Sequence, residues 1–532
     1  MSVLVRRLFR RDVPEVKPPE GFMNLFMKNP CGEPIALRLN FALQSSGTLA
    51  ILFVLFCSYR KVHIPFFIQK EKEKPNEQKG KNMDFLVDFS TPLGEIKPVN
   101  GVCNGPSKFT AKYFKKAHIP FARLHDMRTH FYHCCDIPSI FRDFDVDEND
   151  PANYDFTLSD YYIEKIRECG TDIIYRLGSS MEQGDFRFHN QPPKDYAKWA
   201  RICEHVIRHY NEGWANGHHW NIQYFEIWNE PDTCNPNREM DGQWTGTPEE
   251  FGEFLSVAAT HLKKCFPDRY IGSYPSCNIL TPEREAFFRT VFSILQKNNV
   301  HIDFCPWHCY GDDPNRTKRY IAKFRSLLDE YGYHDTVQLC TEWNYFWLRP
   351  GVWSEFELDG GEYLFEEMFK TASSEVGASF SFAQMITFQQ SEVKLATMHR
   401  ADALSVYCTM FNIYGVPQKQ FSAFYAYDAL REEKTEVAVT SLGNTDGVYT
   451  MAAGTADSAC IGIAQYRGTW KSYDLDVRGL DENATYIVER YLTDDKRNYE
   501  RISIEEGKPS ALSFRQYLKE NSVFVMKIRK KA

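Results

Sequence analysis

Residues 224–232 read YFEIWNEPD, and this stretch indicates the fold class of the chain. Its aromatic and apolar residues predict a strand over Tyr224–Glu230. A helix is predicted after it, because Thr247, Pro248 and Glu250 match an N-cap, a first-position proline and the third-position acid of a capping box. A strand followed by an amphipathic helix is the repeating unit of α/β folds.

The same unit recurs on both sides of this stretch. Helices with one apolar stripe separate the strands, as in Tyr196–Tyr210, where apolar residues recur three and four positions apart. Eight units predict an α/β fold, the (β/α)8 TIM barrel. A doubly wound sheet would need a glycine-rich phosphate turn after the first strand, which the sequence lacks. The other strands are predicted at Ile96–Cys103, Ile119–His125, Asp172–Leu177, Tyr270–Tyr274, Ile302–Tyr310, Val337–Asn344 and Ala378–Phe388.

Beyond the barrel, predicted over residues 95–431, the pattern changes. Residues 432–532 carry short strand-like runs separated by Gly, Asp and Asn turns, which predicts an accessory β-sandwich domain. Residues 83–94 also resemble a strand, and we expect it to pair with that domain. The strands of the β-sandwich are predicted at Glu436–Leu442, Ala459–Tyr466, Tyr473–Val477, Tyr486–Tyr491 and Ser522–Ile528.

Residues 1–82 differ from the rest of the chain. Leu39–Tyr59 is uncharged, but only Leu49–Cys57 is strongly apolar, so the segment is marginal for a membrane-spanning helix. Lys and Arg are equally numerous on its two sides, which indicates no orientation. We interpret residues 1–82 as a non-native extension upstream of Met83. A single membrane anchor and an ordered extra element are the alternatives.

The charge and the cysteine content of the chain indicate which partners and which compartment to expect. A net charge of −8 argues against a nucleic-acid partner. The 15 cysteines form no CxxC pair, so zinc-ribbon spacing is absent, and their scatter indicates buried free thiols in a reducing compartment. We therefore expect a cytoplasmic protein, with membrane anchoring through residues 39–59 as the alternative. A homo-oligomer is compatible with the sequence.

Two carboxylates mark the expected active site. Active sites of such barrels lie at the C-terminal ends of the strands. Glu230 ends the predicted fourth strand and Glu342 ends the seventh, on the opposite side of the barrel. Glycoside hydrolysis needs such a pair, because one carboxylic acid protonates the leaving oxygen while a second carboxylate attacks the anomeric carbon or activates water.

Longer strings resemble glycoside hydrolase family 39, a family of clan A that contains β-xylosidases and α-L-iduronidases. The resemblance covers about residues 84–530 and says nothing about residues 1–82. It implies a barrel plus a β-sandwich and a retaining mechanism without any metal or organic cofactor. The strings that carry it are KPVNGVCNGP (97–106), FEIWNEPD (225–232), WHCYG (307–311), TEWN (341–344) and FNIYGVPQKQF (411–421).

The resemblance also implies roles for single residues. Glu230 would be the acid/base, Glu342 the nucleophile, and Asn229 would bind the sugar's 2-hydroxyl. Tyr310 would position Glu342. Substrate contacts are expected from Asn229, His125, His308, Tyr310 and Trp343, with Trp228 and Trp347 as further candidate platforms for a sugar ring.

Other chemistry-bearing residues have plainer interpretations. Glu226 shares the face of Glu230 and is expected to pair inside the barrel with Arg123 or Arg176. Cys305, His308 and Cys309 suggest a metal site, but strand alternation points His308 away from both cysteines. His218 and His219 lie in a turn rich in Gly and Trp, where we expect them to cap or pack and not to bind metal.

The sequence thus predicts an exo-acting β-xylosidase that releases xylose from xylo-oligosaccharides. An α-L-iduronidase, which would need cations such as Arg123 or Arg349 for the uronate, or an arabinosidase is the alternative within the family. A non-catalytic carbohydrate-binding relic is disfavoured by the retained Glu pair, and a membrane-tethered adhesion protein rests on residues 39–59 alone. Gln389, Gln390 and Glu392, after the predicted eighth strand, are candidates for shaping the outer subsites.

Overall fold

The computed structural model describes residues 84–127, 133–181, 189–233, 242–347, 355, 358–403, 405, 407–442, 446–469 and 471–532. For residues 1–83 it describes the backbone of four strands, at 22–28, 34–43, 49–57 and 60–67. The chain divides into two compact units, Met1–Lys81 and Asn82–Ala532.

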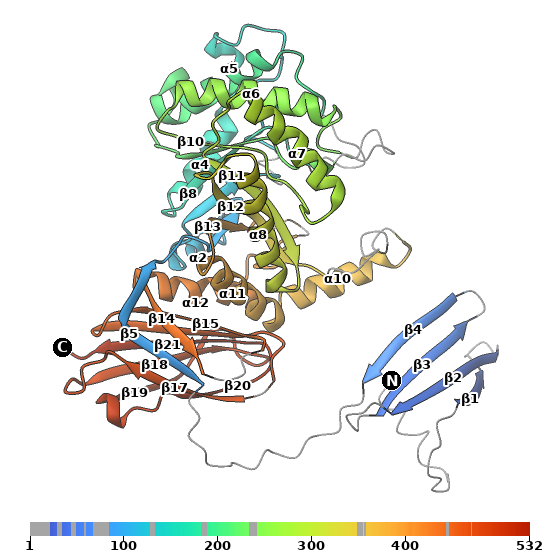
Figure 1. Ribbon diagram of the computed structural model, residues 1–532, viewed down its shortest axis with the longest axis vertical. Helices are drawn as coiled ribbons and strands as arrows, with labels where there is room; N and C mark the ends of the chain where they lie inside the picture. Colours follow the sequence, from blue (N-terminus) through green and yellow to red (C-terminus); the bar gives the residue numbers. More distant parts are fainter. Residues whose placement is uncertain are drawn as a thin grey trace. The chain divides into compact units, whose positions relative to one another are not determined.

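The first unit contains an antiparallel sheet in the order β1-β2-β3-β4 (Figure 1). The strands are β1 (Phe22–Lys28), β2 (Pro34–Leu43), β3 (Leu49–Cys57) and β4 (Arg60–Phe67). The strongly apolar run of this region is therefore strand β3. None of the helices in the described parts of the chain combines the length and the apolar character that crossing a membrane requires.

The second unit is built on a closed barrel of eight parallel strands, which confirms the predicted fold class. Neighbouring strands pair in chain order, and the last strand, β13, pairs with the first, β6. The strands are β6 (Gly101–Cys103), β7 (Phe121–Leu124), β8 (Asp172–Leu177), β9 (Tyr224–Ile227), β10 (Tyr270–Gly272), β11 (Phe304–Gly311), β12 (Val337–Tyr345) and β13 (Val393–Met398).

Helices cover the outside of the barrel. In α6, the capping box predicted at Thr247 and Glu250 is present, and α5 ends at Gly213 in the left-handed conformation. The helices are α2 (Ala111–Lys116), α3 (Ile137–Ile140), α4 (Thr157–Arg167), α5 (Tyr196–Glu212), α6 (Pro248–Cys265), α7 (Pro282–Lys297), α8 (Pro314–Glu330), α10 (Gly361–Ala372), α11 (Glu375–Gln389) and α12 (Ser422–Arg431).

The predicted eighth strand, Ala378–Phe388, is wrong, because these residues form helix α11. This helix lies between the barrel and the β-sheet domain, where it contacts β12 and β13 on one side and β15, β16 and β21 on the other (Figure 1). Every residue from Gly377 to Gln389 is buried. A helix that is apolar all round has no amphipathic stripe, so its sequence resembles a buried strand.

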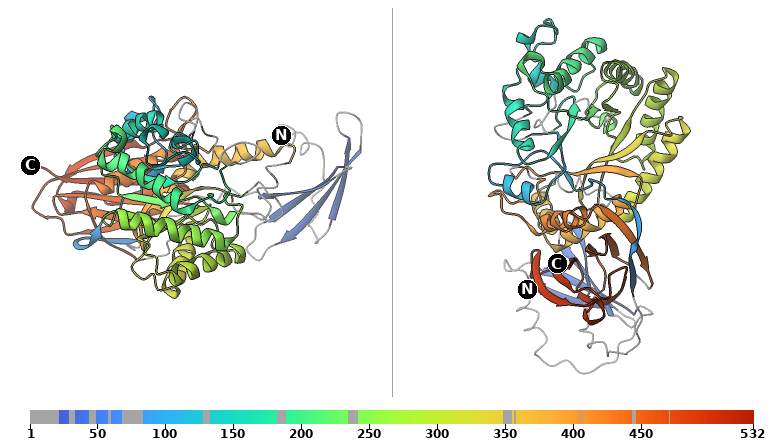
Figure 2. Two further views of the ribbon diagram at one scale, coloured as in Figure 1. Left: turned by 90° about the horizontal axis from the view of Figure 1, so that it is seen from above. Right: turned by 90° about the vertical axis from the view of Figure 1, so that its left-hand side faces the viewer.

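Nine strands form the C-terminal domain, in the hydrogen-bonded order β19-β18-β21-β16-β15-β14-β5-β17-β20. Strand β5 (Phe85–Glu95) precedes the barrel in the chain yet pairs with β14 and β17 in this sheet (Figure 2). The domain has an apolar core of its own, which includes Phe85, Tyr473 and Phe524. The remaining strands are β14 (Thr435–Ser441), β15 (Val448–Gly454), β16 (Ser458–Gln465), β17 (Lys471–Arg478), β18 (Tyr486–Thr493), β19 (Glu500–Gly507), β20 (Arg515–Leu518) and β21 (Ser522–Lys530).

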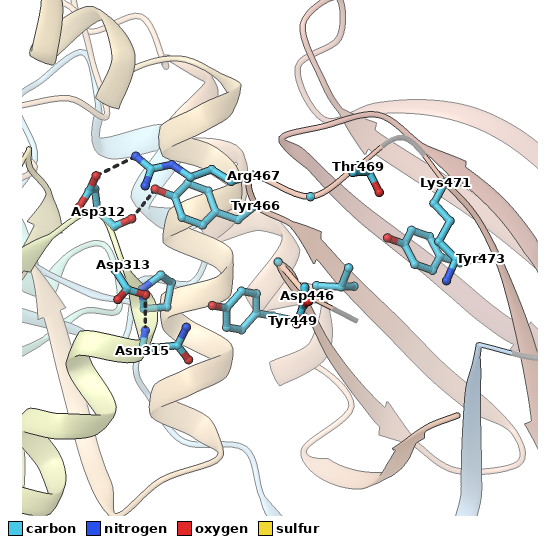
Figure 3. Close-up of a pocket in the computed structure, with 14 residues that line it drawn as sticks. Asp312, Asp313, Asn315, Asp446, Tyr449, Tyr466, Arg467, Thr469, Lys471 and Tyr473 are labelled. Atoms are coloured by element: carbon cyan, nitrogen blue, oxygen red, sulfur yellow. Dashed lines mark hydrogen bonds and ion pairs between the residues drawn. The ribbon is translucent and has the colours of Figure 1, made fainter. Parts of the chain in front are cut away.

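A pocket of about 460 Å³ lies where the loop after β11 meets the β-sheet domain (Figure 3). Arg467 donates to the carboxylate of Asp312 at 2.8 Å, and the Tyr466 hydroxyl donates to the backbone carbonyl of Asp312 at 2.5 Å. The faces of the flanking tyrosines are covered, since Arg467 lies over Tyr466 and Lys471 lies over Tyr473. The two hydrogen bonds to Asp312 join the barrel to the β-sheet domain.

Candidate active site

Glu230 and Glu342 come together at the C-terminal ends of the barrel strands. Glu230 follows β9, and Glu342 lies in β12, in register with His308 of β11. An oxygen of each carboxylate and a ring nitrogen of His308 all lie within 4.8 Å of one another. Both glutamates are buried, with 8% and 5% of their surface exposed. The two strand ends therefore form one site.

The closest side-chain contact of Glu230 is to a neutral group. Its Oε1 lies 2.5 Å from Nδ1 of His308, and burial lowers the pKa of that imidazole to about 3, so His308 is neutral near pH 7. Burial also raises the pKa of Glu230, although a hydrogen bond from the Cys277 thiol opposes the shift. A raised pKa keeps the carboxyl proton available, which is what a general acid requires.

The backbone around Glu230 is strained. Trp228 and Glu230 both have positive φ, at 71° and 39°, although neither is glycine. This turn carries Glu230 out of β9, and Glu230 N donates to the carbonyl of Pro275 at 3.1 Å. Next to it, burial raises the pKa of Asp232 to about 6, and Asp232 accepts from the Ser276 hydroxyl at 2.6 Å.

The surroundings of Glu342 are polar and charged. Arg123 donates to Oε1 at 2.6 Å, and the Tyr310 hydroxyl donates to Oε2 at 2.5 Å. Burial and the Glu342 carboxylate raise the pKa of Tyr310 well above its usual range, so the hydroxyl keeps its proton. Both oxygens of Glu342 are thus held in one orientation.

Arg123 connects the two halves of the site. It is fully buried, pairs with Glu226 inside the barrel, and donates to the amide oxygen of Asn229 at 2.8 Å. Arg176, the other candidate partner of Glu226, pairs with Asp136 instead. The amide nitrogen of Asn229 makes no hydrogen bond within the described residues, so it remains available to a substrate.

Two more histidines face Glu342. Nε2 of His125 lies 3.7 Å from Oε1, and Nδ1 of His399 lies 3.8 Å from Oε2. Burial lowers the pKa of both rings well below the usual range. Sequence reasoning missed His399, because it follows β13, the strand that was misplaced. Within the described residues, four buried atoms of these side chains make no hydrogen bond: Asn229 Nδ2, His125 Nδ1, His308 Nε2 and His399 Nδ1.

The three tryptophans proposed as sugar contacts pack against other side chains. Trp343 is wrong as a substrate contact, because it is completely buried and packs edge-to-face against Phe388 of α11. It follows Glu342 in β12, so pleating points it to the outside of the barrel. Trp228 packs against Trp199 and Trp244. Trp347 is half-buried and packs against the small cluster of Phe346 and Met368.

Three further predictions concern residues other than the carboxylate pair and the tryptophans. Gln389, Gln390 and Glu392 precede β13, so they lie at the N-terminal end of the barrel and are wrong as subsite residues; Gln389 hydrogen-bonds Glu436 of the β-sheet domain at 2.7 Å. Arg349 lies outside the described residues. Cys309 points away from the site toward Thr317, so the three residues Cys305, His308 and Cys309 do not converge on a metal.

Comparisons with known proteins give a family match for most of the barrel. Residues 101–338 match the model of Glycosyl hydrolases family 39. A curated β-xylosidase from Geobacillus stearothermophilus is 22% identical over 198 residues, which are 35% of this chain and 37% of that protein. The match thus spans little more than a third of the relative's length.

Solved structures share the fold. A glucosidase from Croceicoccus marinus has a TM-score of 0.68 and 21% identity, covering 85% of this chain and 99% of its own. AbfB, a family 51 α-L-arabinofuranosidase from Bifidobacterium longum, has a TM-score of 0.57 and 13% identity, covering 85% and 100%. At these identities the likeness concerns the fold alone.

Proposed function

We infer that this chain, whose barrel belongs to glycosyl hydrolase family 39, hydrolyses O-glycosidic bonds with retention of anomeric configuration. The observation that carries the proposal is the pair Glu230 and Glu342, whose oxygens approach within 4.8 Å while their other contacts differ in charge. Retaining glycosidases hold their carboxyl groups about 5–5.5 Å apart, whereas inverting enzymes leave about 6.5–9.5 Å for a water.

The mechanism is a double displacement. A carboxylate oxygen of Glu342 attacks the anomeric carbon, the bond to the leaving oxygen breaks, and Glu230 gives its proton to that oxygen. Glu230, now a carboxylate, then takes a proton from water, whose oxygen attacks the anomeric carbon and releases Glu342. Arg123 and Tyr310 orient Glu342 throughout, and Asn229 is placed to bind the 2-hydroxyl of the sugar.

The substrate that we propose is a neutral β-xyloside, cleaved from the end of a xylo-oligosaccharide. Arg123 is the charged donor nearest the nucleophile among the described residues, and Glu226, Glu342 and Asn229 already occupy it. The three histidines of the site are neutral. A uronate carboxylate would gain little from such surroundings, which disfavours the iduronidase alternative. The curated β-xylosidase relative supports the xyloside.

The test is hydrolysis of aryl glycosides by the full chain. The panel holds a β-xyloside, an α-L-iduronide, an α-L-arabinoside, a β-glucoside and a β-galactoside. We expect turnover of the β-xyloside, with the β-anomer of xylose appearing first in NMR spectra. An α-anomer as first product would contradict retention. Turnover of another sugar alone would show that the substrate is not a xyloside. A folded protein that binds xylo-oligosaccharides but cleaves nothing would indicate a relic.

We also propose that the protein works in a reducing compartment such as the cytoplasm. The described cysteines are all unpaired, and most of them are buried. Unpaired thiols are typical of proteins kept away from an oxidising environment. Alkylation with and without reductant, read by mass spectrometry on protein from its native cells, would reveal any disulfide that contradicts this proposal.

A further inference from the structure

A second cluster of ionisable side chains lies outside the active site. It consists of Asp160 of α4, His209 in the last turn of α5, and His218 in the loop that follows; we call these three residues the α4–α5 cluster. Nε2 of His209 lies 2.9 Å from Oδ1 of Asp160, and Nε2 of His218 lies 3.4 Å from Oδ2. One atom from each residue falls within 4.8 Å of the other two.

The loop after α5 is folded so that it brings His218 back to His209. Gly213 reverses the chain with a φ of +77°. Gly217 then passes so close that a Cβ there would stand 2.1 Å from the carbonyl oxygen of His209. His218 N donates to that carbonyl at 2.6 Å, and Trp220 N donates to the carbonyl of Tyr210 at 2.8 Å. The position of His218 is therefore fixed by backbone contacts.

Aromatic neighbours fix the two imidazole rings. Phe156 stacks on His209 with ring centroids 3.5 Å apart and planes within 4°. Trp220 stacks on His218 at 3.7 Å and 14°. The two imidazoles are nearly perpendicular, with centroids 5.6 Å apart. Both Nε2 atoms are thus held in place before any ligand arrives, which reduces the entropy that binding costs.

The hydrogen bonding of His209 sets its tautomer. Its Nδ1 lies 2.9 Å from the backbone carbonyl of Trp214, which can only accept, so Nδ1 carries the hydrogen. Nε2 then faces a carboxylate oxygen of Asp160 at 2.9 Å, a geometry that a cation shared by the two atoms satisfies. A backbone carbonyl bound to the far nitrogen is the usual support of a metal-binding histidine.

His218 indicates which cation fits. A proton on His209 Nε2 would give His209 and Asp160 a hydrogen bond but would leave Nε2 of His218 without one. Nε2 of His218 is buried and makes no hydrogen bond within the described part of the chain, although Asp160 is near. A metal ion uses all three groups at once. Two imidazoles and a carboxylate are a ligand set that suits zinc.

We propose that the α4–α5 cluster binds one Zn²⁺ ion through His209 Nε2, His218 Nε2 and an oxygen of Asp160, with water as the fourth ligand. The side chains of Asp160 and His218 are 28% and 30% exposed, which leaves access for that water. The ion would tie α4 to the end of α5 and to the following loop, so its role is to stabilise the barrel, apart from glycoside chemistry.

A second group of potential ligands serves as the control. Glu204, His261 and Cys265 also lie within 4.8 Å of one another. There, however, Arg208 donates to Glu204 at 2.8 Å, so a cation already neutralises the carboxylate. His219, exposed and next to His218, is the other matched control.

The test uses the full chain, stripped with a chelator and titrated with ZnCl₂ by calorimetry, with thermal unfolding measured in parallel. We expect one Zn²⁺ per chain at this cluster and a rise in Tm on binding. His218→Ala and Asp160→Asn should each weaken binding more than about 100-fold, because even supporting residues contribute about 10–100-fold. His219→Ala and His261→Ala should bind as the unaltered chain does, and MgCl₂ should not compete.

Binding of Co²⁺ can be measured by a spectroscopic signal that a loss of stability alone would not change. Tetrahedral cobalt with nitrogen ligands absorbs visible light, and this absorption should be lost in His218→Ala. Unfolding curves in chelator show whether the variant still folds. The proposal is overturned if folded, unaltered protein binds no Zn²⁺, if His218→Ala binds it equally well, or if His261→Ala alone removes it.

Discussion

The ends of strands β9 and β12 present the same side chain in opposite surroundings. Glu230 is held by a neutral imidazole at 2.5 Å, and a thiol lies beside it. Glu342 is held by a guanidinium at 2.6 Å and a phenol at 2.5 Å. Low polarity favours the protonated form of a carboxyl group, whereas a cation favours the carboxylate. The proposed mechanism needs such a difference, because it gives the two glutamates of one barrel different roles.

The sharpest test of this comparison removes Glu342, the proposed nucleophile. Glu342→Gln should lower kcat by about 10⁴-fold or more on every substrate of the chain, because no covalent intermediate can form. Steady-state kinetics on an activated aryl glycoside measures this loss. Glu392→Gln, at the other end of the barrel, is the matched control and should keep its activity. Comparable activity in both variants would show that Glu342 takes no part in the reaction.

Changing the acid should produce a loss that depends on the leaving group. Glu230→Gln should lower kcat/KM by about 10²–10⁴-fold on alkyl glycosides and far less on aryl glycosides whose leaving groups need no proton. The basic limb of the pH profile, which lies above the usual range of a glutamate because burial raises the pKa of Glu230, should disappear. Equal losses on both substrate types would reverse the two roles.

Tyr310, whose hydroxyl contacts Glu342 but not Glu230, should contribute less to activity than either glutamate. Tyr310→Phe removes one hydrogen bond to a carboxylate, a loss of about 1.5–3 kcal/mol, or about 10- to 100-fold in kcat/KM. Tyr274→Phe is the control, since its buried hydroxyl makes no hydrogen bond among the described residues. If Tyr310→Phe behaves like Tyr274→Phe, Arg123 alone orients the nucleophile.

The smallest expected effect is on the pH dependence of stability, through Asp232, which lies close to Glu230. Because burial raises the pKa of Asp232 to about 6, the folded chain binds this proton more tightly than the unfolded chain. The free energy of unfolding should therefore fall, by at most about 3 kcal/mol, as the pH rises from about 4 to about 6. Asp232→Asn should flatten this dependence in urea unfolding series, whereas the exposed Asp335→Asn should leave it unchanged.

Some positions of the site followed directly from local pattern. Glu230 and Glu342 can be predicted from the sequence because each lies near the end of a strand, and the strand ends on one side of a barrel surround one site. His308 and Tyr310 alternate with Cys309, so pleating alone placed them on the inner face. The same rule, applied to Trp343 next to Glu342, would have placed that tryptophan outside, where it packs against Phe388.

The alternation of strands and helices, seven of the eight barrel strands and the pair of carboxylates can be predicted from the sequence, because periodicity and capping are local properties of the chain. Tertiary contacts, in contrast, make residues 375–389 a helix, let β13 close the barrel and bring His399 to the site, and place Arg123 against both Asn229 and Glu342. A helix buried on all sides loses its periodic signal, and contacts between distant strands depend on how the barrel closes.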